Sequence, residues 1–431
     1  MKISVIGCGY LGAVHAAGMA KIGHEVVGID VDQAKVDSLN AARAPFFEPG
    51  FDELLSEVSD SLSFSTDMSA LSDATVHFLA VGTPQSESGA ADMTYVNDAV
   101  TKLTAHLKPG DVVVGKSTVP VGTAQRLSEM IRSTGAKLMW NPEFLREGFA
   151  VQDTLAPDRL VYGIAEGDDE LVDVLDEVYR PLIERETPRL VMDYATAELV
   201  KVAANSFLAT KISFINAMAE IADVVGADVT QLADAIGHDS RIGRRFLNAG
   251  IGFGGGCLPK DIRGFMKRAE ELGVGQAVAF LDDVDQVNLR RRRRVEDILV
   301  EELGPLQGKT IAVWGLAFKP DSDDIRDSPA LDIAEGIARA GAHVHAFDPE
   351  AMGPAERRIG SSGLSGSFTL SASAADALEG ADAVVVATEW AEFRNFDPSS
   401  VASRVVVDGR NCLDRDAWKA AGWVYRGMGR R

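Results

Sequence analysis

Short apolar runs alternate with helical patterns in the N-terminal part of the chain. Four runs rich in Val and Ile are predicted to be strands, at residues 2–6, 26–29, 76–81 and 111–115. Strands that are buried on both faces carry continuous apolar runs of this kind. Helical stretches such as residues 11–22 separate these runs. The alternation predicts βαβ units, and therefore a parallel sheet with right-handed crossovers.

The middle of the chain has a different pattern. Residues 194–218 are predicted to be helical and are unusually apolar, and residues 265–303 are also predicted to be helical. No strand pattern lies between these points. A helix that is apolar on more than one face must be buried, which indicates an interface between subunits. We therefore expect a central helical domain with one long helix, through which the chain forms a homodimer or a larger homo-oligomer.

The C-terminal part returns to the α/β pattern, with predicted strands at residues 310–314, 343–347, 383–387 and 404–407. The Ser/Gly-rich stretch 361–373 is predicted to be an exposed turn. The fold class is therefore α/β, with two Rossmann-like, doubly wound domains joined by the central helical domain. The expected domain ranges are 1–193, 194–303 and 304–431.

Charge and composition exclude several classes of function. The chain has 64 acidic and 43 basic residues and a net charge of −21, which opposes nucleic-acid binding. No apolar stretch approaches the about 18 residues of a membrane span. Three cysteines, odd in number and far apart, indicate a reducing compartment, and a predicted strand beginning at Ile3 leaves no room for a signal peptide. We expect a cytoplasmic protein without a metal site.

The segment Gly7-Cys8-Gly9-Tyr10-Leu11-Gly12 follows a predicted strand and opens a predicted helix. In a dinucleotide-binding turn, Gly7 permits the tight turn, Gly9 lets the backbone approach a pyrophosphate, and Gly12 allows close packing of helix on strand. The helix N-terminus then holds the pyrophosphate. Asp30 ends the second predicted strand, where a carboxylate binds the ribose hydroxyls and opposes a 2′-phosphate. The pattern predicts NAD rather than NADP.

Two further loops follow predicted strands. Gly82-Thr83-Pro84 comes after the third strand, and residues 117–123, which include Thr118, come after the fourth. Ligands bind at the carboxyl ends of the strands in a doubly wound sheet, so both loops are predicted to line the cofactor cleft. Ordinary turn chemistry is the alternative for either loop alone.

Residues 252–261 read Gly-Phe-Gly-Gly-Gly-Cys-Leu-Pro-Lys-Asp. So many glycines favour close approach of the backbone to a ligand. Pro259 suits the first turn of a helix, which places Cys257 just before that turn. The helix N-terminus and Lys260 are expected to lower the pKa of the Cys257 thiol, and the thiolate is a nucleophile. Cys8 and Cys412 are expected to be ordinary apolar residues.

Two groups of polar residues have both a functional and a plain interpretation. Glu198, Lys201 and Asn205 share one helix face, which is either partly buried with partners or a solvated stripe. Glu143 and Glu147 either support acid–base chemistry or are surface charges. Lys319, Arg326 and Arg410 follow predicted strands and suit a phosphate or carboxylate ligand. The five arginines at 290–294 are expected to be solvated helix surface.

These segments together resemble the UDP-glucose 6-dehydrogenase family, within the UDP-glucose/GDP-mannose dehydrogenases. The resemblance covers nearly the whole chain. It rests on the motifs GCGYLG, AVGTP, STVPVGT, NPEFLREG, AELVKVAANSF, RIGRRFLNAGIGFGGGCLPKD, GLAFKPDSDDIRDSP and VVVDGRN. The cysteine within FGGGCLPKD is the most specific of these signals. The family usually has serine immediately before that cysteine, where this chain has Gly256.

The resemblance implies oxidation of a sugar alcohol to a uronic acid with two NAD+. Cys257 would form a thiohemiacetal and then a thioester. Lys201 and Asn205 would stabilise an oxyanion, Asp261 and Thr118 would handle protons with a water, and Glu143 and Glu147 would act in acid–base steps or in positioning. The cofactor contacts implied are Gly7, Gly9, Tyr10, Leu11, Gly12, Asp30, Lys35, Gly82, Thr83, Thr118, Glu147, Lys260 and Arg326.

The resemblance also implies a UDP-sugar substrate. Its contacts would be Glu143, Phe144, Leu145, Lys201, Asn205, Arg241, Phe246, Asn248, Gly250, Phe253, Gly254, Cys257, Phe318, Lys319 and Arg410, with Arg241 supplied by a neighbouring subunit. GDP-mannose, UDP-N-acetylglucosamine and UDP-N-acetylmannosamine are the alternative substrates. A simpler NAD-dependent hydroxyacid dehydrogenase would need neither Cys257 nor residues 305–431. A non-catalytic NAD-binding protein would have no use for Cys257, Lys201 and Asp261 together.

Overall fold

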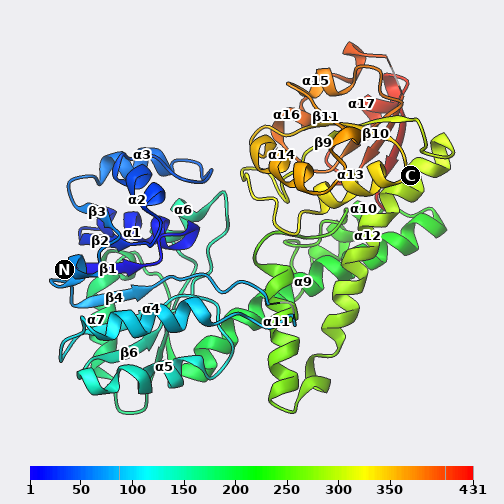
Figure 1. The fold of residues 1–431 in the computed structure, drawn as a ribbon. Coiled ribbons are helices and arrows are strands. Elements are labelled where there is room, and N and C mark those ends of the chain that lie inside the picture. Colours follow the sequence, from blue (N-terminus) through cyan, green and yellow to red (C-terminus); the bar gives the residue numbers. More distant parts are fainter. Residues whose placement is uncertain (87, 403, 431) are drawn as a thin grey trace. The chain divides into compact units, whose positions relative to one another are not determined.

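The structure is a computed structural model that describes every residue except 87, 403 and 431. The chain forms two compact units (Figure 1). The first comprises Met1–Ala204 and Arg263–Gly275, and the second comprises Asn205–Ile262 and Gln276–Arg431. Each unit contains one sheet. Helices α9 (Tyr194–Val225) and α11 (Leu258–Glu271) contribute residues to both.

The first unit is built on an eight-stranded sheet, counted over the described residues, in the order β3-β2-β1-β4-β5-β6-β7-β8. The strands are β1 (Lys2–Ile6), β2 (Glu25–Ile29), β3 (Leu62–Ser65), β4 (Val76–Leu79), β5 (Val112–Gly115), β6 (Lys137–Trp140), β7 (Leu160–Ile164) and β8 (Arg189–Asp193). Neighbours are parallel except β6 and β7, which pair antiparallel. The apolar runs predicted the central strands because these are buried on both faces.

Helices cover this sheet on both sides (Figure 1). They are α1 (Tyr10–Lys21), α2 (Gln33–Asn40), α3 (Phe51–Glu57), α4 (Thr94–Thr104), α5 (Thr123–Ile131), α6 (Ala150–Leu155), α7 (Glu170–Val178) and α8 (Arg180–Ile183), with short 3-10 turns at Met68–Leu71 and Arg132–Thr134. Helix α1 is rich in Ala and Gly and is buried along nearly its whole length. Its small side chains let it lie close to the sheet, which places its N-terminus at the end of β1.

The second unit has a six-stranded, wholly parallel sheet in the order β11-β10-β9-β12-β13-β14 over the described residues. The strands are β9 (Thr310–Trp314), β10 (His343–Phe347), β11 (Phe368–Leu370), β12 (Ala383–Val386), β13 (Val405–Asp408) and β14 (Val424–Gly427). The accompanying helices are α13 (Pro329–Arg339), α14 (Met352–Ser361), α15 (Ala374–Ala377), α16 (Ala391–Arg394) and α17 (Arg415–Ala420), with 3-10 turns at Ser365–Ser367 and Pro398–Ser400.

Strand β11 lies inside the stretch 361–373, so the prediction of an exposed turn there is wrong for residues 368–370. Phe368 and Leu370 pack against the core of this unit, while Thr369 between them faces outward. A strand of three residues at the edge of a sheet has too short an apolar pattern to stand out from its Ser/Gly-rich surroundings. Strands β3 and β14, which are also short and lie at the edges of their sheets, were not predicted for the same reason.

The helical region between the sheets contains α9, α10 (Val229–Gly237), α11, the 3-10 turn Gly275–Val278 and α12 (Phe280–Leu303). No strand occurs among the described residues from 194 to 303. Helix α9 has 32 residues, which confirms the predicted long helix. The predicted helical stretch 265–303 is two helices, α11 and α12, with the 3-10 turn between them.

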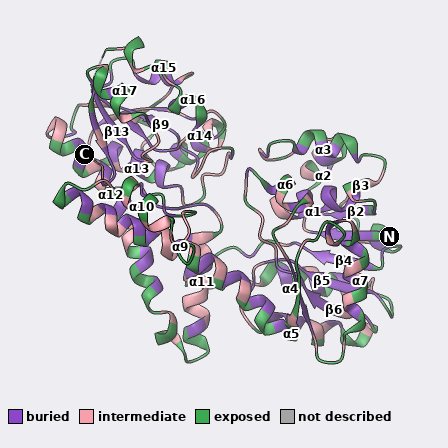
Figure 2. Ribbon diagram, turned by 180° about the vertical axis from the view of Figure 1, so that it is seen from behind, coloured by how far each residue is buried: buried purple, intermediate pink, exposed green. Residues whose placement is uncertain are grey.

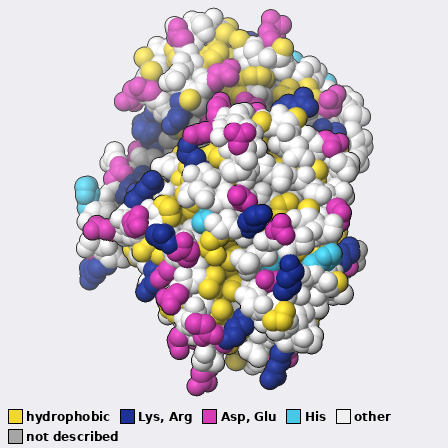
Figure 3. All heavy atoms as spheres, turned by 90° about the vertical axis from the view of Figure 1, so that its left-hand side faces the viewer, with side chains coloured by type: hydrophobic (Ala, Val, Ile, Leu, Met, Phe, Trp, Pro, Cys, Tyr) yellow, Lys and Arg dark blue, Asp and Glu magenta, His cyan; other side chains and the backbone are white. Residues whose placement is uncertain are grey.

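Burial follows the layers within each unit. Figure 2 shows the central strands of both sheets buried and the covering helices exposed on their outer faces, whereas the edge strand β8 is largely exposed. Acidic and basic side chains are interspersed over the face drawn in Figure 3. In the part of the chain that the structure describes, no helix is long and apolar enough to cross a membrane. The α/β fold class with two Rossmann-like sheets and a helical middle is confirmed.

Candidate active site

The glycine-rich turn between β1 and α1 has two kinds of glycine. Gly7 has φ of 88°, and a Cβ on Gly12 would lie 1.8 Å from the Gly7 carbonyl oxygen. Packing within the protein therefore requires both of them. A Cβ on Gly9, the residue that caps α1, would have no atom within 4 Å. The space above Gly9 and the amides of the first turn of α1 suit a pyrophosphate.

Asp30 lies at the carboxyl end of β2, as predicted. Its Oδ2 accepts a hydrogen bond from the Cys8 amide at 2.8 Å, and Lys35 Nζ lies 3.0 Å away. The carboxylate is buried and thus held at the turn that would carry the pyrophosphate. Cys8 is buried beside it, and burial, followed by the charge of Asp30, raises the pKa of the Cys8 thiol. Cys8 is therefore an unreactive core residue.

The loops after β4 and β5 contact each other. The Thr83 hydroxyl donates to the Thr118 carbonyl at 2.8 Å, and the Ser117 hydroxyl donates to the Val81 carbonyl at 2.6 Å. Both bonds join the carboxyl ends of adjacent strands. Glu198 holds the segment that follows, since its oxygens accept from the amides of Gly122 and Ala124 at 2.7 and 2.6 Å. Its carboxylate therefore caps the N-terminus of α5.

Lys201 and Glu143 form a buried ion pair in the first unit, with Nζ 3.1 Å from Oε1. The other oxygen of Glu143 accepts from the Leu145 amide at 2.6 Å. The Phe144 ring lies 5.5 Å from Lys201 Nζ, measured to its centroid. These contacts hold the ammonium group of Lys201 in one place, so Glu143 is not a solvated surface charge.

Two residues that the sequence analysis missed support this unit. Lys116 is buried, donates to Asn141 Oδ1 at 3.0 Å, and lies over the rings of Phe78 and Tyr179. Glu48 is buried and accepts hydrogen bonds from Tyr10, from the Gly148 amide and from the Ala150 amide. Neither has a sequence signal, because the partners lie far away in the chain.

In the second unit, Cys257 lies immediately before α11, as its sequence setting predicts, and it is exposed. Its carbonyl accepts the first helical hydrogen bond, from the Asp261 amide at 2.9 Å. Asp261 is buried, and its two oxygens accept from Lys260 Nζ at 2.7 Å and from Asn205 Nδ2 at 2.6 Å. The structure thus gathers Asn205, Lys260 and Asp261 at the helix end that carries the thiol.

The glycines before Cys257 have an immediate cause in protein packing, where the sequence pattern favoured close approach to a ligand. A Cβ on Gly252, which has φ of 98°, would lie 2.4 Å from Asn288 Oδ1. On Gly254 it would meet the Asp327 carbonyl at 2.2 Å, on Gly255 the Phe318 ring at 2.7 Å, and on Gly256 the Arg326 guanidinium at 2.4 Å. Residues 252–256 therefore pack tightly against other parts of the same unit.

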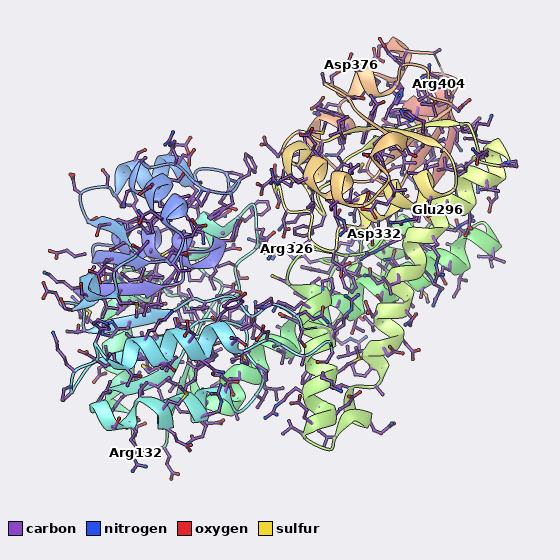
Figure 4. The ribbon with its side chains drawn as sticks, viewed as in Figure 1. Arg132, Glu296, Arg326, Asp332, Asp376 and Arg404 are labelled. Atoms are coloured by element: carbon purple, nitrogen blue, oxygen red, sulfur yellow. The ribbon has the colours of Figure 1, made fainter. Side chains whose placement is uncertain are left out.

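The cations predicted near the strand ends of the second unit have different settings. Arg410 donates to the carbonyls of Ala387, Gly252 and Phe318 at 2.8, 3.0 and 3.1 Å, so it joins three loops. Arg326 projects from the segment between β9 and α13 and pairs with Asp324 (Figure 4). Lys319 Nζ lies 5.2 Å from the centroid of the Phe318 ring. Arg410 is therefore built into the loops, and Arg326 is the more exposed cation.

Three of the remaining predicted substrate residues, Arg241, Phe246 and Asn248, lie on the surface of this chain. Arg241 is largely exposed and pairs with Asp239 two residues away. Phe246 is partly exposed and has φ of 67°, a conformation that is uncommon outside glycine. Asn248 accepts a hydrogen bond from Arg244 at 2.8 Å. Among the described residues, no group of three or more His, Cys, Asp and Glu side chains is arranged to hold a metal ion.

Sequence comparison identifies three segments of one family. Residues 1–183 match the NAD binding domain of the UDP-glucose/GDP-mannose dehydrogenase family, residues 195–290 match its central domain, and residues 312–415 match its UDP binding domain. The NAD binding domain agrees with the turn at Gly9 and the carboxylate of Asp30. NAD is therefore the cofactor.

Full-length relatives give the same result. The chain is 40% identical to the UDP-glucose 6-dehydrogenase of Rhizobium meliloti over 443 residues, with all of both chains covered. It is 40% identical to that of Pseudomonas aeruginosa, with 100% of this chain and 98% of the relative covered. A solved UDP-glucose dehydrogenase from Pyrobaculum islandicum has a TM-score of 0.91 at 38% identity and covers 100% of this chain and 98% of its own. This chain is an NAD-dependent dehydrogenase and belongs to the UDP-glucose/GDP-mannose dehydrogenase family.

Proposed function

We propose that the enzyme oxidises UDP-glucose to UDP-glucuronate and transfers four electrons to two NAD+ for each sugar. The observation that carries this proposal is the exposed Cys257 at the N-terminus of α11, with Lys260, Asp261 and Asn205 gathered around the same turn. An alcohol dehydrogenase that stopped at the aldehyde would need no nucleophile there. The relatives named UDP-glucose 6-dehydrogenases support the choice of sugar.

The first oxidation converts the sugar CH2OH group to an aldehyde. The alcohol loses a hydride and also loses a proton to a base. The cofactor NAD+ would accept the hydride. We assign the proton to a water held by Asp261 and Thr118. The lysine ammonium of Lys201 and the amide of Asn205 stabilise the negative oxygen that develops at the reacting carbon.

The second oxidation requires Cys257. The thiolate adds to the aldehyde carbon and forms a thiohemiacetal, which loses a second hydride and a proton to become a thioester. Water then hydrolyses the thioester to the carboxylate and returns the thiol. Glu143 and Glu147 serve in acid–base steps or in positioning the water. The covalent bond keeps the reactive aldehyde on the enzyme between the two hydride transfers.

We assign the cofactor contacts to the glycine turn with Tyr10 and Leu11, to Asp30 and Lys35, and to the loops at Gly82-Thr83 and Thr118. Open space at Gly9 and the buried Asp30 carboxylate support this. Glu147, Lys260 and Arg326 complete the proposed set. The sugar nucleotide is assigned to Phe144, Leu145, Phe246, Asn248, Gly250, Phe253, Gly254, Phe318, Lys319 and Arg410, besides the catalytic residues.

We propose that two copies associate through α9. Phe207, Phe214 and Ile221 recur every seven residues on this helix and are 66%, 50% and 55% exposed. Side chains at this spacing lie along one helix face, and such a stripe is typical of a helix-packing interface. Arg241 would then be available to a neighbouring subunit.

We also propose domain ranges of 1–193, 194–303 and 304–431. A cytoplasmic location is proposed as well, in keeping with three free cysteines.

The deciding experiment counts NADH formed for each UDP-glucose consumed by the purified enzyme at neutral pH. The proposal expects two, with UDP-glucuronate as the product. Cys257→Ser should lose the second step, since a hydroxyl at this position is a much weaker nucleophile. An unchanged turnover in that variant would contradict the mechanism. NADH formed only with GDP-mannose or an N-acetylated UDP-sugar would keep the mechanism and change the substrate.

A further inference from the structure

The backbone around Gly250 is held from both sides by two buried side chains. The Gly250 amide donates to Asn216 Oδ1 of α9 at 2.8 Å, and Arg291 Nε of α12 donates to the Gly250 carbonyl at 3.2 Å. Asn216 and Arg291 both have an exposed fraction of 0%. All three residues lie in the second unit. One glycine therefore has both its peptide groups fixed by side chains from two different helices.

The next residues along the loop are anchored by the same face of α12. Asn288 accepts from the Phe253 amide at 2.7 Å and donates to the Phe253 carbonyl at 3.0 Å. Arg292 also donates to the Phe253 carbonyl, at 3.2 Å. Residues three and four apart lie on one helix face, so Asn288, Arg291 and Arg292 form one row along the loop. The interpretation of residues 290–294 as solvated surface is therefore wrong for Arg291 and Arg292.

Arg291 is an unfavourable residue to bury. Its Nη1 and Nη2 donate no hydrogen bond within the described part of the chain, and neither does Nδ2 of Asn216. Burial lowers the pKa of the Arg291 guanidinium, and only the more distant charges of Asp223 and Glu220 oppose this. A buried charge without a close partner destabilises a fold, and an apolar residue of similar size would often be better. Stability alone thus gives no reason for arginine at this position.

We infer that Arg291 and Asn216 are positioning residues for the sugar nucleotide, because they hold the loop from Asn248 to Phe253 in its binding conformation. The inference rests on the proposed function, in which Asn248, Gly250 and Phe253 contact the substrate. A glycine-rich loop has many accessible conformations, and ordering it on binding would weaken affinity. Two anchors on the Gly250 peptide groups restrict the loop before the ligand arrives.

The arginine run provides a matched control. Arg293 is exposed on the same helix, two residues from Arg291. The variants Arg291→Met, Arg291→Lys and Arg293→Met are compared for the KM of UDP-glucose, the KM of NAD, kcat, the Kd of UDP by calorimetry and the melting temperature. Arg291→Met should raise the UDP-glucose KM and the UDP Kd on the order of tenfold, while the KM of NAD stays unchanged. Arg291→Lys should recover part of the loss, and Arg293→Met should match the wild type.

A second variant keeps the test decisive if Arg291→Met does not fold. Asn216→Ala removes only the acceptor of the Gly250 amide and should raise the same two constants. The inference is overturned if the folded variants bind UDP as tightly as Arg293→Met does. It is also overturned if the KM values of UDP-glucose and NAD rise equally along with a lower melting temperature, which would indicate a purely structural role. Failure of the proposed function would appear separately, as absence of NADH from wild-type enzyme with UDP-glucose.

Discussion

Asn205 and Asp261 are joined by a hydrogen bond of 2.6 Å, although 56 residues separate them in the chain. The bond links α9 to the first turn of α11, the turn that begins beside Cys257. Lys260 occupies the other oxygen of the same carboxylate. Asp261 is therefore fixed in orientation by two charged or polar partners, as the proton transfer proposed for it requires.

Asp261→Asn should reduce kcat by about 10²- to 10⁴-fold, the usual contribution of a positioned acid–base group, with a smaller change in the KM of UDP-glucose. The amide keeps the size of the side chain but cannot take up a proton. Steady-state kinetics at saturating NAD measure both constants. Asp98→Asn, on the exposed surface of α4, is the control and should behave as wild type. A loss of less than about tenfold in Asp261→Asn would remove Asp261 from the proton path.

The sequence predicted those parts of the fold that depend on local pattern. The central strands, the turn at Gly7 to Gly12 and the long helix α9 each carry their signal within a few residues. Strand β11 was missed because its apolar run is only three residues long, and β6 and β7 were missed although their apolar residues are buried. In the same way as the central strands, the position of Cys257 immediately before a helix was predicted from its own neighbours.

The supporting residues could not be identified in this way. Glu48 and Lys116 act through contacts with residues that lie 25 (Lys116 to Asn141) to 102 (Glu48 to Ala150) positions away. Arg291 contacts Gly250, 41 positions away, and belongs to an arginine run whose pattern indicates solvent exposure. Burial of a charged residue is decided by how helices and strands pack together, which a single sequence does not display. The glycine pattern before Cys257 favoured close approach of the backbone to a ligand. The close contacts of these glycines in the structure are with other residues of the protein.

Iodoacetamide at pH 7.5 should modify Cys257 before the other two cysteines, and NADH formation should fall in parallel. Cys257 is exposed. Burial raises the pKa of Cys8 and of Cys412, with Asp30 and Asp408 adding to the effect. A raised pKa reduces the thiolate fraction at this pH, and the thiolate is the reactive form. Peptide mass spectrometry at timed intervals measures each site. Faster labelling of Cys412 would contradict the proposed reactivity, and Cys412→Ser should label and lose activity like wild type.

Asp30→Asn should lower kcat/KM for NAD by about tenfold or more and reduce the preference for NAD over NADP. The amide oxygen can still accept from the Cys8 amide, so the turn should be preserved. The negative charge that opposes a 2′-phosphate is lost, and Lys35 remains beside it. The ratio of kcat/KM for the two cofactors measures the change. Asp98→Asn, on the exposed surface of α4, should leave that ratio unchanged.

Titration of Lys116 should make the free energy of unfolding rise with pH in the alkaline range. Burial lowers the pKa of its ammonium group to about 8, although Glu143 favours the charged form. Between pH 8 and the unfolded value of 10.5, the native state has released this proton while the unfolded state still binds it. The unfolded state then binds more protons, so the free energy of unfolding rises with pH across this window. Below pH 8 the lysine is protonated in both states, so it makes the free energy of unfolding neither rise nor fall with pH.

Lys116→Met removes this titration and keeps an unbranched side chain among Phe78, Tyr179 and Asn141. The free energy of unfolding of the wild type minus that of Lys116→Met should therefore increase by up to about 3 kcal/mol between pH 7 and pH 10.5. Urea unfolding at several pH values measures it, and other titrating groups cancel in the difference. Lys102→Met, on the exposed face of α4, should give a difference that does not vary with pH. A constant difference for Lys116→Met as well would contradict this prediction. It would mean that the lysine has the same pKa in the folded and unfolded chain, which is incompatible with an ammonium group buried against two aromatic rings.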